Sequence, residues 1–284
     1  MPTLRLPLHN LDEQSKVPHR QGGLELRLPN IDHPAPEHEL ASMSIPRAAP
    51  RLEPEDVDRI LESVDGWLGP DEGRLLYRLA AVADPGGAIV EIGSWHGRST
   101  IWLAAGARAG RGARVVAIDP HSGTELRLDG ARTDEILRRN LADAGVEDLV
   151  EVVTATSADV AATWTQPVSL LWIDGDHSYA SAKEDFDLWE PFLRPEAAVA
   201  LHDTFVTLGP ERVVRERLIA TRRFTGFVHA ETTTAARRCD VLSARASLTR
   251  RVELARRSLY GMRLRLYDTN RFGFATLRDR ILAR

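Results

Sequence analysis

The 284-residue chain contains one cysteine, Cys239, and only two lysines, Lys16 and Lys183. A single cysteine excludes an intramolecular disulfide and a zinc site built from several cysteines, and it fits a reducing compartment. We expect Cys239 to be an inert strand residue. No apolar run approaches the roughly 20 residues of a membrane span, and the residues after Met1 lack the long apolar core of a signal peptide. These absences predict a cytoplasmic protein.

A large excess of positive charge is also missing. The formal net charge is −4, which argues against a nucleic-acid binder. The average conceals a polarised chain, because residues 241–284 hold eleven arginines against Glu253, Asp268 and Asp279. We assign no site to this arginine bias. The length suits one α/β domain with extensions at its ends.

Residues 1–50 hold eight of the chain's 16 prolines, and a continuous helix or a central strand would not tolerate them. They are predicted to form an extended Pro-rich N-terminal arm. Residues 24–28 alternate in the manner of a strand, so the arm either adds an edge strand, wraps a partner subunit or floats free. Two amphipathic helices follow within residues 53–83, and we expect them to cap the sheet.

The dinucleotide motif Gly-x-Gly-x-x-Gly and the Gly-Lys-Ser/Thr of phosphate loops are both absent, which argues against a Rossmann dehydrogenase. Residues 88–92 instead form an apolar run of the kind found in buried parallel strands, with Glu91 near its end. Gly93 and Gly97 follow, and a helix is predicted from Arg98 to Ala107. The turn between them leaves backbone N–H groups free to face a ligand, and glycine lets that ligand approach closely. An acid at this place repels pyrophosphate but suits an ammonium, a sulfonium or hydroxyls.

Further strands and helices alternate along the chain, which predicts a doubly wound sheet. Strands are expected at residues 114–119, 149–154, 168–174 and 197–203, and helices at 133–144, from 180 to 192 and at 211–220. Residues 224–229 and 237–242 are expected to pair as an antiparallel hairpin. Asp119 falls about 28 residues after Glu91, where a doubly wound fold places a carboxylate that accepts hydrogen bonds from ribose hydroxyls.

The Glu-x-Gly-x-x-x-Gly turn resembles motif I of the class I S-adenosylmethionine (SAM) dependent methyltransferases. The segments 173–179, 192–195 and 201–204 resemble, more specifically, the branch that methylates small molecules, which includes the sugar O-methyltransferases of macrolide and related antibiotic pathways. The resemblance covers about residues 85–205. It implies an α/β fold with a doubly wound, mostly parallel, seven-stranded Rossmann-like methyltransferase sheet and helices on both faces. We place this domain at residues 51–245.

The same resemblance implies that the turns after the first four strands bind SAM. The cofactor-binding residues it implies are Glu91, Gly93, Ser94, Trp95, Gly97, Ser99, Asp119, Pro120, His121, Ser157, Asp159 and Asp174. Among these, Ser157 is also a candidate N-cap for the following helix, and His121 is expected to contact either the cofactor or the acceptor.

By resemblance, Asp174 and Asp203 bind Mg²⁺, and His177, three residues after Asp174, is the general base. Several relatives place two adjacent acids after the fifth strand, whereas this chain has His202 and Asp203. Because Mg²⁺ prefers oxygen ligands, His202 makes the expected metal site of Asp174, Asp203 and His202 unusual. His202 and His121 are the reserve candidates for the base.

These residues predict an enzyme that transfers a methyl group from SAM to a hydroxyl of a small-molecule acceptor, with a sugar or glycoside as one class, assisted by Mg²⁺ and a histidine base. A non-catalytic SAM-binding or nucleotide-binding scaffold or regulatory subunit, and an N-methyltransferase of a small molecule, stay open as alternatives.

The C-terminal tail, residues 246–284, reads as a basic amphipathic helix. An apolar stripe of this helix consists of Val252, Ala255, Leu259, Met262 and Leu266. The stripe either packs on this domain or on a second subunit, or it lies on a membrane surface. We expect a homo-oligomer.

Overall fold

The computed structural model describes residues 51–122, 133–240 and 244–271. The chain divides into two units, Met1–Ala48 and Ala49–Arg284, and all described residues belong to the second. The predicted N-terminal arm and residues 272–284 of the predicted tail lie outside the described residues, so nothing here tests those predictions.

The described part of the chain forms a seven-stranded sheet with the order β3-β2-β1-β4-β5-β7-β6. The strands are β1 (Ala88–Ile92), β2 (Val115–Ile118), β3 (Val150–Val153), β4 (Val168–Ile173), β5 (Leu193–Leu201), β6 (Phe224–Ala230) and β7 (Thr233–Arg238). Neighbours from β3 to β5 pair in parallel, and β7 runs antiparallel to β5 and β6. The predicted mostly parallel seven-stranded sheet with a closing hairpin is confirmed.

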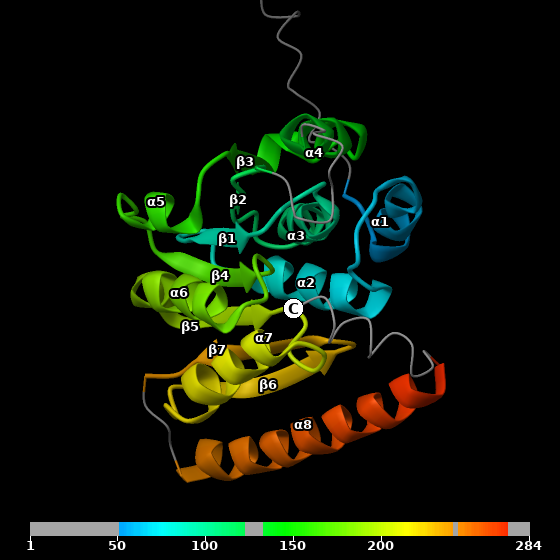
Figure 1. The fold of residues 1–284 in the computed structure, drawn as a ribbon. Helices are drawn as coiled ribbons and strands as arrows, with labels where there is room; N and C mark the ends of the chain where they lie inside the picture. Colours follow the sequence, from blue (N-terminus) through cyan, green and yellow to red (C-terminus); the bar gives the residue numbers. More distant parts are fainter. Residues whose placement is uncertain (1–50, 123–132, 241–243, 272–284) are drawn as a thin grey trace, which may run out of the picture. The chain divides into compact units, whose positions relative to one another are not determined.

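Helices cover both faces of this sheet (Figure 1). One face carries α1 (Pro54–Ile60), α2 (Pro70–Val82), α3 (Arg98–Ala109) and α4 (Thr133–Asp143), and the other carries α5 (Ser157–Ala161), α6 (Tyr179–Trp189) and α7 (Leu208–Val213). Short 3-10 turns lie at Leu61–Ser63, Glu147–Leu149 and Glu190–Phe192, and α7 continues as a π-helix at Val214–Ile219. The predicted helices on both faces, including the two cap helices before β1, are therefore present.

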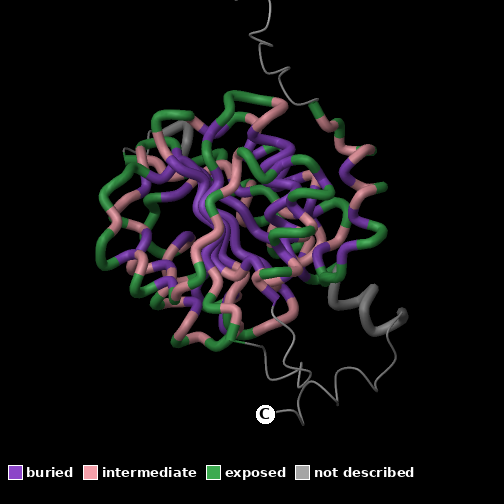
Figure 2. The backbone as a smooth tube through the Cα atoms, turned by 90° about the horizontal axis from the view of Figure 1, so that it is seen from above, coloured by how far each residue is buried: buried purple, intermediate pink, exposed green. Residues whose placement is uncertain are grey.

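The central strands of the sheet, β1 and β4, are fully buried. Every residue of β1 and β4 is buried, and the strands form a continuous buried band in Figure 2. This is why both strands are apolar runs rather than alternating ones. Because β1 and β4 are adjacent and parallel, the turns that follow them leave the sheet at the same edge, where open α/β sheets bind ligands.

Four local predictions were wrong. β5 begins at Leu193, four residues before the strand predicted at 197–203. β7 begins at Thr233, four residues before the predicted strand, so Cys239 lies just beyond it. The helix expected at 211–220 is α7 followed by the π-helix. The N-cap of α5 is Thr156, whose hydroxyl accepts from the backbone N–H of Asp159.

The last described element is α8, Ala244–Arg271, which packs against β6 at the edge of the sheet (Figure 1). It begins two residues before the predicted tail. No helix among the described residues combines the length and apolar character needed to cross a bilayer.

Candidate active site

The turn after β1 depends on glycine because it touches the turn after β4. Gly93 has φ +89°, and a Cβ at this position would lie 2.3 Å from the carbonyl oxygen of Asp174. We predicted that glycine here lets a ligand approach. The described contact is instead with the backbone of Asp174 and Gly175, so Gly93 sets how closely the two turns can meet.

Glu91 is completely buried at the end of β1. Its Oε1 accepts a hydrogen bond from the hydroxyl of Ser99 at 2.5 Å, and its Oε2 accepts one from Thr100 at 2.6 Å. Burial raises the pKa of Glu91 to about 8, although both hydroxyls oppose that rise. Glu91 and Ser99, both predicted cofactor residues, therefore bind each other in this structure. Their contact with SAM stays a prediction.

Asp119 organises the other side of the same turn. Its Oδ2 accepts from the backbone N–H of Trp95 at 2.9 Å, and its Oδ1 accepts from that of His121 at 2.8 Å. Each carboxylate oxygen can accept a further bond. Two buried side-chain atoms of the bonded segments, Oγ of Ser94 and Nε2 of His121, have no hydrogen-bond partner among the described residues. An unpaired buried polar atom costs about 1–3 kcal/mol, so this turn fits a ligand rich in polar groups.

Sequence reasoning did not single out Arg98, which fixes the segment between α1 and α2. Its guanidinium donates to the carbonyl oxygens of three residues in that segment, which are Leu61 at 2.8 Å, Val64 at 2.6 Å and Leu68 at 3.1 Å. The ring of Trp67, from the same segment, stacks on Trp95 with centroids 4.9 Å apart. Trp67 is 71% exposed. The segment between α1 and α2 thus reaches the turn after β1.

The predicted cofactor residues Ser157 and Asp159, beside which the resemblance places the adenine ring, lie at the start of α5. The hydroxyl of Ser157 accepts from the indole N–H of Trp189 at 2.9 Å. The Oδ2 of Asp159 accepts from the hydroxyl of Thr156 at 2.6 Å. Both side chains therefore have structural partners, and their role toward adenine stays a prediction.

The structure brings together the predicted acidic and histidine residues of β4 and β5. The ring of His177 lies between two carboxylates, with Nε2 3.5 Å from Oδ1 of Asp174 and Nδ1 3.5 Å from Oδ2 of Asp203. Nδ1 of His202 lies 2.8 Å from the same oxygen of Asp174. Asp203 has φ +55°, a conformation that asparagine and aspartate tolerate better than most residues. All four residues were identified from the sequence.

One group among the described residues has the spacing of a metal site. Asp174, His177 and His202 each offer a ligand atom, and these atoms lie within 4.8 Å of one another. Asp203 is outside this group of three. Compared with the predicted set of Asp174, Asp203 and His202, the geometric group replaces Asp203 with His177.

Glu72 of α2 is the residue of this site that sequence reasoning missed. Its side chain is 2% exposed, and its Oε2 lies 3.3 Å from Nε2 of His202 and accepts from the backbone N–H of Gly69 at 2.9 Å. Its Oε1 accepts from the backbone N–H and hydroxyl of Thr232 and from the hydroxyl of Thr233. The sequence around Glu72 shows only an acid at the third position of a helix that begins with proline. Such an acid is typical of a helix cap and does not indicate a site residue.

His202 is therefore held between two carboxylates, one at each ring nitrogen. With a hydrogen on both nitrogens, the ring can donate to both carboxylates as an imidazolium. Burial alone lowers the pKa of His202, but Asp174 and Glu72 outweigh it and raise that pKa to about 11. The pKa of Asp174 is held low against burial by His202 and His177. That His202 binds a metal ion stays a prediction, since His202 also belongs to the group with the spacing of a metal site.

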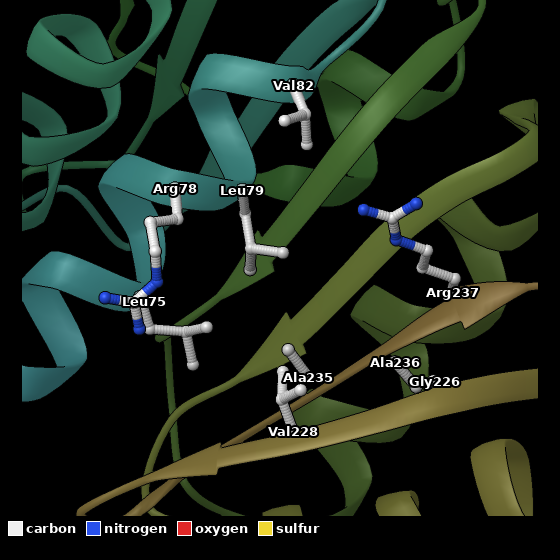
Figure 3. A pocket seen from close by; sticks show the side chains of 9 residues that line it. All are labelled: Leu75, Arg78, Leu79, Val82, Gly226, Val228, Ala235, Ala236 and Arg237. Atoms are coloured by element: carbon white, nitrogen blue, oxygen red, sulfur yellow. The ribbon is translucent and has the colours of Figure 1, made fainter. Parts of the chain in front are cut away.

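A cavity among the described residues lies away from this cluster. It has a volume of about 270 Å³ and lies between α2 and the β6–β7 hairpin (Figure 3). Leu75, Leu79 and Val82 of α2 face Ala235 and Val228 across it. None of the predicted site residues lines it, so the shape of this hollow does not locate the chemistry.

The chain is similar to known methyltransferases. The model of a family described as a methyltransferase domain matches residues 90–204. A catechol O-methyltransferase of Mycobacterium tuberculosis is 35% identical over 177 residues, covering 55% of this chain and 74% of the relative. A Corynebacterium glutamicum protein of solved structure covers 64% of this chain and 89% of its own, at 17% identity and a TM-score of 0.51.

A further solved structure is the O-methyltransferase TomG from Streptomyces achromogenes, in complex with SAM, at 23% identity and a TM-score of 0.48 over 66% of this chain and 87% of that one. The length and identity of the match to the mycobacterial relative identify the family independently of these weaker structural likenesses. This chain belongs to the class I SAM-dependent O-methyltransferases.

Proposed function

We propose that this enzyme methylates a hydroxyl of a small molecule and that His177 removes the hydroxyl proton. The observation that carries the proposal is the position of the His177 ring between the carboxylates of Asp174 and Asp203, 3.5 Å from each. The hydrogen bond to Asp174 raises the pKa of His177 above its usual value. A neutral alcohol is a poor nucleophile at neutral pH, so a histidine base beside it raises its reactivity.

The donor set near His177 fits a divalent cation of the Mg²⁺ type. Such cations take carboxylate oxygens, and Asp174 and Asp203 supply these on either side of the crevice. We therefore propose Asp174 and Asp203, and not His202, as the residues that would hold it. A bound cation of this kind orients a hydroxyl and lowers its pKa.

The remaining residues align the two substrates. Ser94, His121 and Asp119 offer the unpaired or partly used polar groups that would bind the nucleoside part of SAM. Arg98 holds the cap segment over the same turn and limits the entry of water. His202, pinned by Glu72, holds the carboxylate of Asp174 in place.

For the acceptor we propose a compound with two adjacent hydroxyls, as in a catechol or a sugar diol. The relative named as a catechol O-methyltransferase supports the first, and the resemblance to sugar O-methyltransferases supports the second. The test incubates the purified enzyme with labelled SAM and matched pairs of acceptors, each pair differing only in one of the two hydroxyls. Transfer to the diols and not to the mono-hydroxy partners supports the proposal.

Two variants separate the base from the cation site. His177→Ala is expected to lower kcat by about 10²–10⁴, the usual range for a lost general base. Asp203→Asn is expected to weaken the response to added Mg²⁺ while SAM binding stays unchanged. Asp176→Asn is the matched control, because Asp176 lies in the same turn but bonds only to Ser178 and Ser181.

Four results would contradict the assignments. Full activity of His177→Ala would show that His177 is not the general base, and a rate unaffected by chelation would show that no divalent cation takes part. SAM binding without transfer to any hydroxyl acceptor favours the scaffold, whereas transfer to an amine favours the N-methyltransferase.

A further inference from the structure

Helix α8 uses one face to bind the domain, and that face combines apolar contacts, such as Leu254 on the core and Tyr260 against Phe205, with buried polar bonds. The guanidinium of Arg250 is buried and donates to the carbonyl oxygens of Phe224, at 3.0 Å, and of Ile219. The carboxylate of Glu253 accepts from the backbone N–H groups of Gly226 and Phe227. These bonds fix the rotation of the helix about its own axis.

The opposite face of α8 is apolar and open. Leu248, Val252, Leu259 and Met262 are 65%, 47%, 65% and 60% exposed, and Ala255 between them is exposed as well. These five residues, the apolar face of α8, recur at alternating spacings of four and three, so they form one stripe along the helix. The predicted packing of this stripe on the domain is therefore wrong. A contiguous apolar patch of this kind marks a contact surface.

The charges beside the apolar face have a single sign. Between residues 247 and 263, where the side chains of α8 are described, the exposed charged residues are Arg251, Arg256 and Arg263. The acid in that stretch, Glu253, is turned toward β6.

This charge pattern decides between two occupants. A second copy docked through the same stripe would bring arginines from both helices together in either orientation, because they flank the stripe. An anionic surface meets no such repulsion, and each arginine near an anionic bilayer contributes about 1 kcal/mol.

We propose that the apolar face of α8 binds the surface of an anionic lipid bilayer. The helix lies in the plane of the interface, with Leu248, Leu259 and Met262 among the acyl chains and the three arginines beside the phosphates. The contact lies on a different element from the residues assigned to methyl transfer, so it stands or falls independently of the proposed function.

The test is co-sedimentation of the full-length protein with phosphatidylcholine vesicles, with and without roughly one third phosphatidylglycerol. We expect binding to the anionic vesicles that weakens with added salt, and little binding to the neutral ones. Arg251→Gln combined with Arg256→Gln and Arg263→Gln should lower the partition coefficient roughly 100-fold, since each charge contributes about a factor of five.

Leu248→Gln combined with Leu259→Gln should abolish binding without unfolding the protein, because both side chains are exposed. Leu208→Gln is the matched control, since Leu208 is 68% exposed on α7 and should leave binding unchanged. Equal binding to neutral and anionic vesicles, or no binding to either, overturns the proposal. So does a lipid-free dimer, seen by analytical ultracentrifugation, that the paired leucine variant dissociates, because the face would then join two copies.

Discussion

Glu72→Gln tests whether the buried carboxylate of α2 holds the acid and histidine cluster together. The substitution preserves size but leaves one acceptor oxygen where the carboxylate has two. In the favourable orientation the amide oxygen keeps the three bonds from Thr232 and Thr233. The amide nitrogen then faces two donors, the backbone N–H of Gly69 and Nε2 of His202.

The cost follows from those two lost bonds. Each leaves a buried donor unpaired at about 1–3 kcal/mol, which gives roughly 2–6 kcal/mol in all. Movement of the Gly69 segment toward water would reduce the loss, so we expect the lower half of this range. Even about 3 kcal/mol is a large part of the 5–15 kcal/mol that stabilises a typical domain.

The measurement is urea unfolding at neutral pH followed by circular dichroism. Asp71→Asn is the control, because Asp71 is the preceding residue, is exposed, and loses the same charge. We expect that control to stay within about 0.5 kcal/mol of the wild type. If Glu72→Gln is as stable as Asp71→Asn, the network contributes nothing measurable and His202 is held by Asp174 alone.

Three further predictions concern the cofactor turn. Burial raises the pKa of Glu91 to about 8, above its value of 4.5 in the unfolded chain, so between these two pH values the native state holds a proton that the unfolded state has lost. The free energy of unfolding should therefore fall by about 1.4 kcal/mol per pH unit as pH rises through that range. Urea unfolding of Glu91→Gln at several pH values should lack that slope. Asp119→Asn should weaken SAM binding by about 1.5–3 kcal/mol for each charged hydrogen bond lost, and unchanged calorimetry would make Asp119 a turn residue only. Gly93→Ala should lose more stability in urea than Gly112→Ala, because both have positive φ but a Cβ meets Asp174 only at Gly93; equal losses would show that backbone strain alone matters.

Most of the fold was predictable because its signals are local. The apolar runs of β1, β2 and β4 are buried on both faces, so composition alone identifies them. Their order in the sheet then follows from the topology that the resemblance implied. The acids at the ends of these strands could be predicted as site residues too, because the end of a buried strand determines where the following residue lies.

The bounds of strand β7 could not be predicted from composition, because its residues are buried by pairing with neighbouring strands and not because they form an apolar run. Thr233 and Thr234 are fully buried, with Ala235 and Ala236 beside them, yet two threonines and two alanines do not read as an apolar strand. Antiparallel pairing with β5 sets the register, for example Val199 opposite Ala236. Only the folded neighbours show which part of the segment enters the sheet.

The role of Glu72 and the orientation of α8 could not be predicted for a related reason. The periodicity of a helix does not reveal which partner each of its faces meets. The bonds of Glu72 to the β6–β7 turn span 160 residues of sequence. In α8, the stripe that reads as the core-facing side is exposed. The side that meets the domain carries Arg250 and Glu253, bonded to backbone carbonyl and amide groups, beside Leu254 and Tyr260.

The acidic and histidine side chains of the cluster carry a net negative charge. Glu72, Asp174 and Asp203 bring three carboxylates together, and His202 neutralises one of them. Even with His177 protonated, one negative charge remains, and a second appears once His177 is neutral. Uncompensated charge is costly in a poorly solvated site. We expect the sulfonium of SAM, a divalent cation or both to supply the missing charge, which would couple ligand binding to proton removal through the same carboxylates.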